Sequence, residues 1–147
     1  MFQVLVVEDD RELNKTVCSY LNQNGYAATG CLSAGEAYNV LYGGSIFDII
    51  LSDIMMPGVD GFEFAKTIRE LNQEIPILFM TARDDFASKR RGFQAGIDDY
   101  MVKPIDLEEL LLRMEALLRR AKIASSKKLT VGSLTLDAEE HTAYLDG

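Results

Sequence analysis

Five short apolar runs alternate with five amphipathic segments along most of the chain, and this alternation constrains the possible folds more than any other feature. The expected strands are Phe2–Val7, Tyr26–Gly30, Phe47–Ser52, Pro76–Met80 and Asp99–Val102. The expected helices are Asp10–Asn24, a segment capped by Ser33 that runs to Tyr42, the segment after Gly61, Asp84–Ala95, and a long helix capped by Asp106. Strands that alternate with helices form a parallel sheet covered on both faces. Because such crossovers are right-handed, we expect a doubly wound, five-stranded α/β fold.

Polar side chains follow four of the five expected strands. The first strand is followed by Glu8, Asp9 and Asp10, and the third, fourth and fifth strands are followed by Asp53, Thr81 and Lys103. In parallel sheets of this kind, ligands bind beyond the carboxyl ends of the strands, where the strand order reverses. We therefore expect these side chains to meet at one edge of the sheet.

Carboxylates that meet at one edge repel one another, and a hard divalent cation relieves that repulsion. Mg²⁺ prefers carboxylate and carbonyl oxygens, and it keeps open positions that phosphate oxygens can occupy. Asp53, at the tip of a buried strand, is then the expected nucleophile. Mg²⁺ and Lys103 would neutralise charge on a transferring phosphoryl group, and the hydroxyl of Thr81 could bind one of its oxygens.

Each of these residues taken alone has a simpler interpretation. Asp10 is better explained as the N-cap of the first helix than as a metal ligand. Thr81 is a hydroxyl at a strand end, Lys103 is an ordinary surface lysine, and Tyr100 is an ordinary strand aromatic. The joint occurrence of such residues at the ends of four strands is what favours a functional site.

Four segments together carry a resemblance to a known family. They read VVEDD at 6–10, DIILSDIMMPGVDG at 48–61, MTAR at 80–83 and DDYMVKP at 98–104. In this order they resemble the receiver domain of two-component response regulators, and the resemblance covers about residues 2–121. It implies the flavodoxin/CheY-like version of the doubly wound fold. The acidic pair after the first strand is Glu-Asp, where the commoner pair in the family is Asp-Asp.

The resemblance implies a role for each position that matches the motifs. Asp53 is the phosphoacceptor, and Lys103 contacts the phosphoryl group. Asp9 binds Mg²⁺ (or Mn²⁺) directly, whereas Glu8 binds it through water. Asp53 and the backbone carbonyl of Met55 complete the protein ligands of the metal.

The same resemblance implies a switch beside the phosphorylation site. In this switch the hydroxyl of Thr81 moves toward the phosphate and the ring of Tyr100 turns inward. The resemblance also assigns Ala82 and Pro104 to this contact region. The Lys103–Pro104 peptide bond is expected to be cis, since cis bonds are essentially confined to proline.

A mixed-charge face between Asp84 and Arg120 resembles the dimerisation face of OmpR/PhoB-type regulators. Its residues are Lys89, Arg91, Phe93, Asp98, Asp99, Glu109, Leu111, Arg113 and Arg120. The expected pairs across a homodimer are Lys89 with Glu109, and Asp99 with Arg113. An ordinary solvated helix face is the alternative, since exposed ion pairs contribute only about 0–1 kcal/mol each, and the resemblance favours the dimer.

The composition changes after the receiver-like region, residues 1–121. We expect residues 122–128 to form a linker and residues 129–147 to form the first antiparallel strands of a second domain. In the OmpR/PhoB-type subfamily that domain is a winged-helix DNA-binding domain, so the resemblance implies a full-length transcription factor that binds promoter DNA. The chain stops before any recognition helix and should lack specific DNA binding by itself. The resemblance also implies a sensor histidine kinase as the phosphodonor.

Charge and cysteine content narrow the choice of partners. A net charge of −8 makes the chain by itself a poor ligand for the phosphate backbone of nucleic acids. Cys18 and Cys31 lack metal-ligand spacing and are expected to be reduced thiols, which is typical of a cytoplasmic protein. No apolar run approaches the roughly 20 residues that span a membrane, so we expect no membrane partner.

Three other functions compete with a phosphoaccepting receiver. A phosphatase of the haloacid-dehalogenase type also uses a strand-end aspartate and Mg²⁺, but it requires a second aspartate two residues later, where this chain has Met55. A nucleotide-binding domain would need a glycine-rich phosphate loop after the first strand, and none is present. A receiver whose output is another protein is disfavoured by the strands expected at 129–147. We therefore do not expect a turnover enzyme.

Overall fold

Five parallel strands form the sheet in the computed structural model, which describes residues 1–132, with side chains described for residues 1–122. The strands are β1 (Gln3–Val7), β2 (Ala27–Cys31), β3 (Ile49–Ser52), β4 (Ile77–Thr81) and β5 (Asp99–Val102). Their order across the sheet is β2-β1-β3-β4-β5, and all neighbouring strands are parallel. The order reverses between β1 and β3. This confirms the predicted doubly wound fold and directs attention to the carboxyl ends of those two strands.

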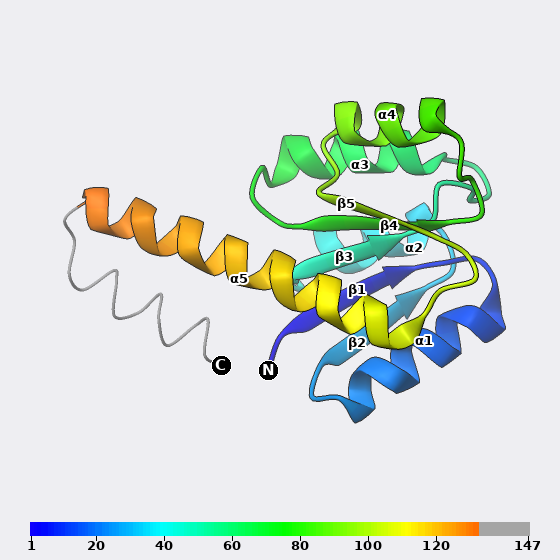
Figure 1. Ribbon diagram of the computed structural model, residues 1–147, viewed down its shortest axis with the longest axis horizontal. Coiled ribbons are helices and arrows are strands. Elements are labelled where there is room, and N and C mark those ends of the chain that lie inside the picture. Colours follow the sequence, from blue (N-terminus) through cyan, green and yellow to red (C-terminus); the bar gives the residue numbers. More distant parts are fainter. Residues whose placement is uncertain (133–147) are drawn as a thin grey trace.

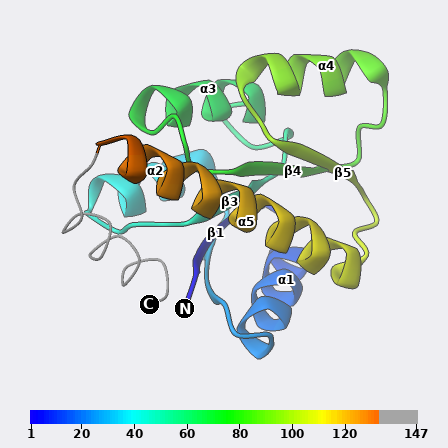
Figure 2. The same cartoon turned by 60° about the vertical axis from the view of Figure 1, so that its left-hand side comes forward.

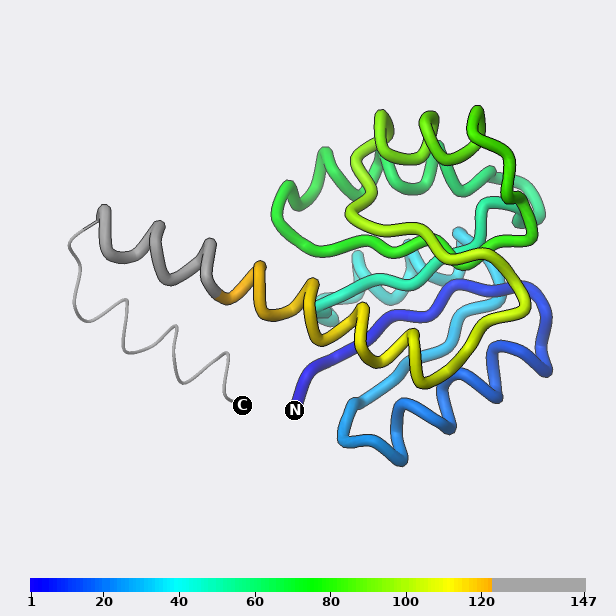
Figure 3. The backbone as a smooth tube through the Cα atoms, viewed as in Figure 1, coloured from blue at the N-terminus to red at the C-terminus, as the bar shows by residue number. Residues whose placement is uncertain are grey.

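Helices cover both faces of the sheet, as Figures 1 and 2 show. They are α1 (Arg11–Gln23), α2 (Ala34–Tyr42), α3 (Gly61–Leu71), α4 (Phe86–Ala95) and α5 (Leu107–Gly132). Helices α1 and α5 lie on one face, whereas α2, α3 and α4 lie on the other (Figure 2). The backbone trace in Figure 3 shows that the chain passes from each strand into the next helix. No helix in the described part of the chain has the length and apolar character to cross a bilayer.

The sheet separates two apolar cores, and β1 contributes to both. Val4 and Val6 pack with α1 and α5, whereas Leu5 and Val7 pack with α2 and α3. All four side chains are fully buried. Burial on both faces explains why this strand is a continuous apolar run rather than an alternating one. Each such side chain contributes about 1.5–3 kcal/mol relative to an exposed one.

Capping residues set the starts of the helices at the edge of the sheet where the strands end. Asp10 accepts hydrogen bonds through Oδ1 from the backbone N–H groups of Glu12 and Leu13, both at 3.1 Å. This confirms the interpretation of Asp10 as an N-cap. Asp60 caps α3 in the same way. These caps fix the loops that carry the candidate site.

The C-terminal end of the described chain differs from expectation. Helix α5 extends to Gly132, so the backbone at 122–128 is helical, and the strand expected at Leu129–Val131 is wrong. The physical reason is local, because residues 122–131 contain no glycine or proline and include alanine and lysine, which favour helix. The remaining expected strands lie at 133–147, outside the described residues.

Candidate functional site

Three carboxylates meet at the carboxyl edge of the sheet. Glu8 and Asp9 follow β1, and Asp53 follows β3. One oxygen from each of the three lies within 4.8 Å of the others. Glu8 is fully buried and Asp53 is 5% exposed, whereas Asp9 faces solvent. The predicted convergence of these residues is therefore present in the structure.

Lys103 provides the one ammonium group that contacts this cluster in the described structure. Its Nζ lies 2.6 Å from Glu8 Oε1 and 2.8 Å from Asp53 Oδ2. Partial burial, the largest single effect, would lower the pKa of Lys103, but the hydrogen bonds and the charge attraction of the two carboxylates together raise it. Lys103 is thus held as a cation between Glu8 and Asp53, and the second of these lies 50 residues from Lys103 in the sequence.

Glu8 is buried and hydrogen-bonded within the cluster. Burial raises the pKa of its carboxyl, and the contact with Lys103 and a hydrogen bond from Asp10 N–H only partly offset that effect. The bond from Asp10 N–H to Glu8 Oε2 measures 3.0 Å. The side chain of Glu8 is thereby held at both oxygens. A glutamate at this position reaches Lys103 directly, which gives the Glu-Asp pair a structural role.

The charge of the cluster remains unbalanced. Three carboxylates face one ammonium, which leaves about two negative charges when all the groups are ionised. A hard divalent cation matches both that charge and the all-oxygen donor set. The residues present therefore fit Mg²⁺ or Mn²⁺, and Glu8, Asp9 and Asp53 are the side chains that would hold it.

The backbone around Asp53 orients its carboxylate. The N–H of Met55 donates to Asp53 Oδ1 at 3.2 Å, while Oδ2 faces Lys103. The N–H of Asp53 donates to the carbonyl of Val7, which ties the end of β3 to the end of β1. Met55 thus contacts the site through its backbone, and its side chain is 55% exposed.

The proposed switch residues both bind the backbone of Arg83. Thr81 is fully buried, and its Oγ1 accepts a hydrogen bond from Arg83 N–H at 3.3 Å. The hydroxyl of Tyr100 donates to the Arg83 carbonyl at 2.6 Å. Tyr100 is buried and its ring packs edge-on against Phe79, 6.3 Å between centroids. Burial raises the pKa of the Tyr100 hydroxyl, which therefore stays protonated and able to donate.

Ala82 and Pro104 lie next to the residues of the site, as the sequence analysis predicted. Ala82 is exposed between Thr81 and Arg83. The Lys103–Pro104 peptide bond is cis, as predicted. Arg83 itself was missed by the sequence reasoning, because its contribution to these contacts comes from backbone atoms and carries no side-chain signature.

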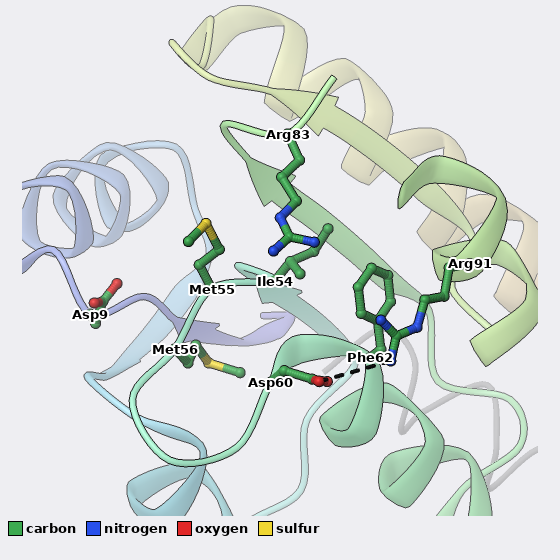
Figure 4. A pocket seen from close by; sticks show the side chains of 8 residues that line it. All are labelled: Asp9, Ile54, Met55, Met56, Asp60, Phe62, Arg83 and Arg91. Carbon is green, nitrogen blue, oxygen red and sulfur yellow. Dashed lines mark ion pairs between the residues drawn. The ribbon is translucent and has the colours of Figure 1, made fainter. Parts of the chain in front are cut away.

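A cleft of about 380 Å³ extends from Asp9 toward α3 and α4. Its lining residues are Asp9, Ile54, Met55, Met56, Asp60, Phe62, Arg83 and Arg91. Figure 4 shows the guanidinium of Arg83 pointing into this cleft. Arg91 stacks over the ring of Phe62 at 4.2 Å and lies 3.9 Å from Asp60 Oδ2 (Figure 4). The acidic cluster is thus open to a molecule that approaches along the cleft.

Several residues of the expected dimerisation face form ion pairs within the chain. Arg113 Nη1 lies 2.9 Å from Asp99 Oδ1, and Arg113 Nη2 lies 3.5 Å from Glu109 Oε1. The hydrogen bonds that Arg113 donates to the Asp99 carboxylate are the main reason that the pKa of Arg113 is raised. Lys89 Nζ lies 5.9 Å from the Tyr100 ring centroid. Phe93 and Arg120 are exposed, whereas Leu111 is partly buried against the core formed with α1.

Two residues assigned to that face lie elsewhere. Asp98 accepts hydrogen bonds from Arg69 at 2.7 Å and from the backbone N–H of Ile77 at 2.9 Å. Arg91 points toward Phe62 and Asp60 at the start of α3. Charge and spacing along the sequence suggested one continuous face, but packing against α3 takes these two side chains away from it.

The sequence of this chain is similar to known response regulators. Residues 4–115 match the response regulator receiver domain. The heme response regulator HssR of Staphylococcus aureus (strain bovine RF122 / ET3-1) is 39% identical over 137 residues, which cover 93% of this chain and 60% of HssR. The chain therefore spans about 60% of the length of the curated relatives it matches.

Solved structures share the same architecture. The receiver domain of the Francisella response regulator 1452 superposes with a TM-score of 0.76 at 31% identity, over 82% of this chain and 98% of that chain. A CheY-like receiver domain protein from Methanospirillum hungatei JF-1 gives a TM-score of 0.80 at 22% identity, over 84% of this chain and 98% of that chain. The second similarity bears on the fold alone.

Proposed function

The chain belongs to the response regulator receiver family, and on that basis we propose that Asp53 accepts a phosphoryl group in a Mg²⁺-dependent reaction. One observation carries the proposal. The buried Asp53 carboxylate lies within 4.8 Å of two further carboxylates and 2.8 Å from the ammonium of Lys103. This arrangement combines a nucleophile, a cation site and a fixed positive charge at one point.

Each residue of the site has a separate role in the proposed phosphoryl transfer. Asp9 and Asp53 would hold the metal directly and Glu8 through water, with the backbone carbonyl of Met55 as a further ligand. When bound, Mg²⁺ supplies positive charge to the phosphoryl oxygens. An oxygen of Asp53 attacks phosphorus, the phosphorus–nitrogen bond of a phosphohistidine breaks, and the histidine leaves. Lys103 stays beside Asp53 and neutralises charge on the transferred group.

Phosphorylation would change the β4–α4 loop through Thr81 and Tyr100. The modification adds a charge of about −1.5 to −2 and three acceptor oxygens next to Asp53. The Thr81 hydroxyl can then turn from Arg83 N–H toward the phosphoryl group. Tyr100 donates a hydrogen bond to the carbonyl of the same Arg83. A movement of Thr81 would therefore be passed through the Arg83 backbone to Tyr100, and from there to the surface formed by α4 and β5.

The partners follow from the family and from the exposed face. A sensor histidine kinase is the proposed phosphodonor, and a homodimer through α4, β5 and α5 is the proposed output. The half-exposed ring of Phe93 on α4 supports that face as an interface. Arg113 pairs with Asp99 and Glu109 within one chain, so the expected Asp99–Arg113 pair across the dimer would require these ion pairs to rearrange. The longer protein is proposed to bind promoter DNA. The reaction modifies Asp53 of the chain itself, so we propose a signalling switch rather than a turnover enzyme.

Intact mass spectrometry tests this function directly. The full chain is incubated with a small-molecule phosphodonor, with and without Mg²⁺, as wild type, Asp53→Asn and Asp60→Asn. We expect one phosphoryl adduct on wild type and Asp60→Asn in the presence of Mg²⁺, and none on Asp53→Asn. Asp60→Asn is the matched control because Asp60 lines the same cleft and asparagine is an equally good N-cap. A Mg²⁺-dependent adduct that persists on Asp53→Asn would refute the assignment.

A further inference from the structure

Asn14 is a buried polar side chain that the proposed phosphotransfer does not use. It lies on α1 and is 6% exposed, although the helix packs there against the apolar interior. Its Nδ2 donates to the backbone carbonyl of Glu8 at 3.0 Å and to that of Cys31 at 2.9 Å. Both amide hydrogens are therefore used within the turn that joins β1 to α1 and at the end of β2.

The surroundings fix the orientation of this amide. Two carbonyls can only accept hydrogen bonds, so the nitrogen of Asn14 must face them. The opposite atom, Oδ1, lies 3.5 Å from the thiol of Cys18, which is a weak donor. A Cβ at Gly30 would collide with Asn14 Oδ1, so the glycine leaves the space that the amide occupies. The pocket is thus shaped for an asparagine in one orientation.

Glu8 is held at both ends of its backbone by this arrangement. Its N–H donates to the Cys31 carbonyl at 2.9 Å, and its own carbonyl accepts from Asn14. The peptide that joins Glu8 to Asp9 is therefore fixed at its carbonyl. Its orientation decides that the Glu8 side chain points inward to Lys103 while Asp9 stays at the surface of the site.

We infer that Asn14 is a positioning residue that sets the spacing of the Glu8 and Asp9 carboxylates for a divalent cation. It touches neither the cation nor Asp53, and it acts through the Glu8 carbonyl. Outer-shell groups that orient ligands typically change metal affinity by roughly ten- to hundredfold when they are removed. This inference rests on the proposed Mg²⁺ site.

The test measures Mg²⁺ affinity by isothermal titration calorimetry on the full chain. Asn14→Leu keeps the approximate volume and removes both donors, and we expect it to weaken Mg²⁺ binding by roughly tenfold or more. Val17→Ala is the matched control, because Val17 is buried one turn further along α1 and contacts the core rather than the turn. Val17→Ala should lower stability and leave Mg²⁺ affinity within twofold of wild type. Cys18→Ala, which keeps both amide donors, should also leave the affinity unchanged.

The outcomes separate this inference from the proposed function. If wild type shows no saturable Mg²⁺ binding, the metal site itself fails. If wild type binds Mg²⁺ and Asn14→Leu binds it within twofold, the positioning role of Asn14 is overturned and the site stands. Should Asn14→Leu not fold, Asn14→Ser takes its place, because the smaller side chain avoids a steric clash and cannot reach both carbonyls. Unchanged affinity in Asn14→Ser overturns the inference equally.

Discussion

The amino ends of the parallel strands form one edge of the sheet and their carboxyl ends form the other, and each of these two edges holds a partly buried ion pair. The two ion pairs differ in how completely their charges and hydrogen bonds are satisfied. At the amino edge Arg69 pairs with Asp98 at 2.7 Å and also donates to the carbonyls of Gly96 and Ile75, at 2.8 and 2.5 Å. At the carboxyl edge Lys103 faces Glu8 and Asp53, with Asp9 nearby. One cation meets one anion at the first edge, whereas one cation meets three anions at the second.

This difference separates a structural ion pair from a candidate site. The Arg69 network joins the ends of α3 and α4 to the starts of β4 and β5, and its acceptors are matched by the donors of one guanidinium. The acidic cluster retains negative charge and opens into a cleft. A balanced network stabilises the fold by itself, while an unbalanced one is stabilised further when a cation binds.

The largest effect is expected when the balanced network is broken. Arg69→Leu leaves the Gly96 and Ile75 carbonyls without these donors and leaves Asp98 without its cation. We expect a loss of about 3 kcal/mol in the free energy of unfolding, measured by urea denaturation. Arg90→Leu, at an exposed position on α4, should change it by no more than about 0.5 kcal/mol. A loss for Arg69→Leu as small as that control would mean that the network is not structural.

A smaller effect, and one that depends on metal, is expected at the other edge. Lys103→Met removes the ammonium that contacts Glu8 and Asp53, two of the three carboxylates of the cluster. We expect a loss of about 2 kcal/mol in unfolding free energy in the presence of a chelator. Mg²⁺ should recover part of that loss, because it supplies the missing positive charge. The same deficit with and without Mg²⁺ would show that the cluster does not bind the ion.

Much of this contrast could not be predicted from the sequence. The five strands of the sheet, the caps at Asp10 and Ser33 and the acidic residues at strand ends follow from short-range patterns and were predicted, whereas the caps at Asp60 and Asp85 were not. Arg69 and Asp98 are 29 residues apart, and no local pattern links them. For that reason Asp98 was assigned to the dimerisation face. Asn14 was overlooked because a single polar residue on a helix carries no signal until its burial is known.

The smallest effect expected is a pH dependence that comes from Glu8. Burial raises the pKa of Glu8 in the folded chain, so the folded state binds its proton more tightly than the unfolded state. Stability of the metal-free protein should therefore fall as pH rises from the unfolded pKa near 4.5 through the higher folded value. Glu8→Gln lacks this loss. Urea denaturation between about pH 4 and 7 in chelator should show the variant gaining on wild type as pH rises, and parallel profiles would contradict this.

The most direct test of the contrast is the unfolding free energy of the full chain as a function of Mg²⁺ concentration. Wild type should gain about 1.4 kcal/mol for each tenfold increase in Mg²⁺ above its dissociation constant. Asp9→Asn should lose most of this gain, because it removes one of the three carboxylates. Asp98→Asn should lower stability at every Mg²⁺ concentration and keep the same gain. A wild-type stability that does not respond to Mg²⁺, or a gain that depends on Asp98 rather than Asp9, would contradict the assignment of the cation site to the carboxyl edge.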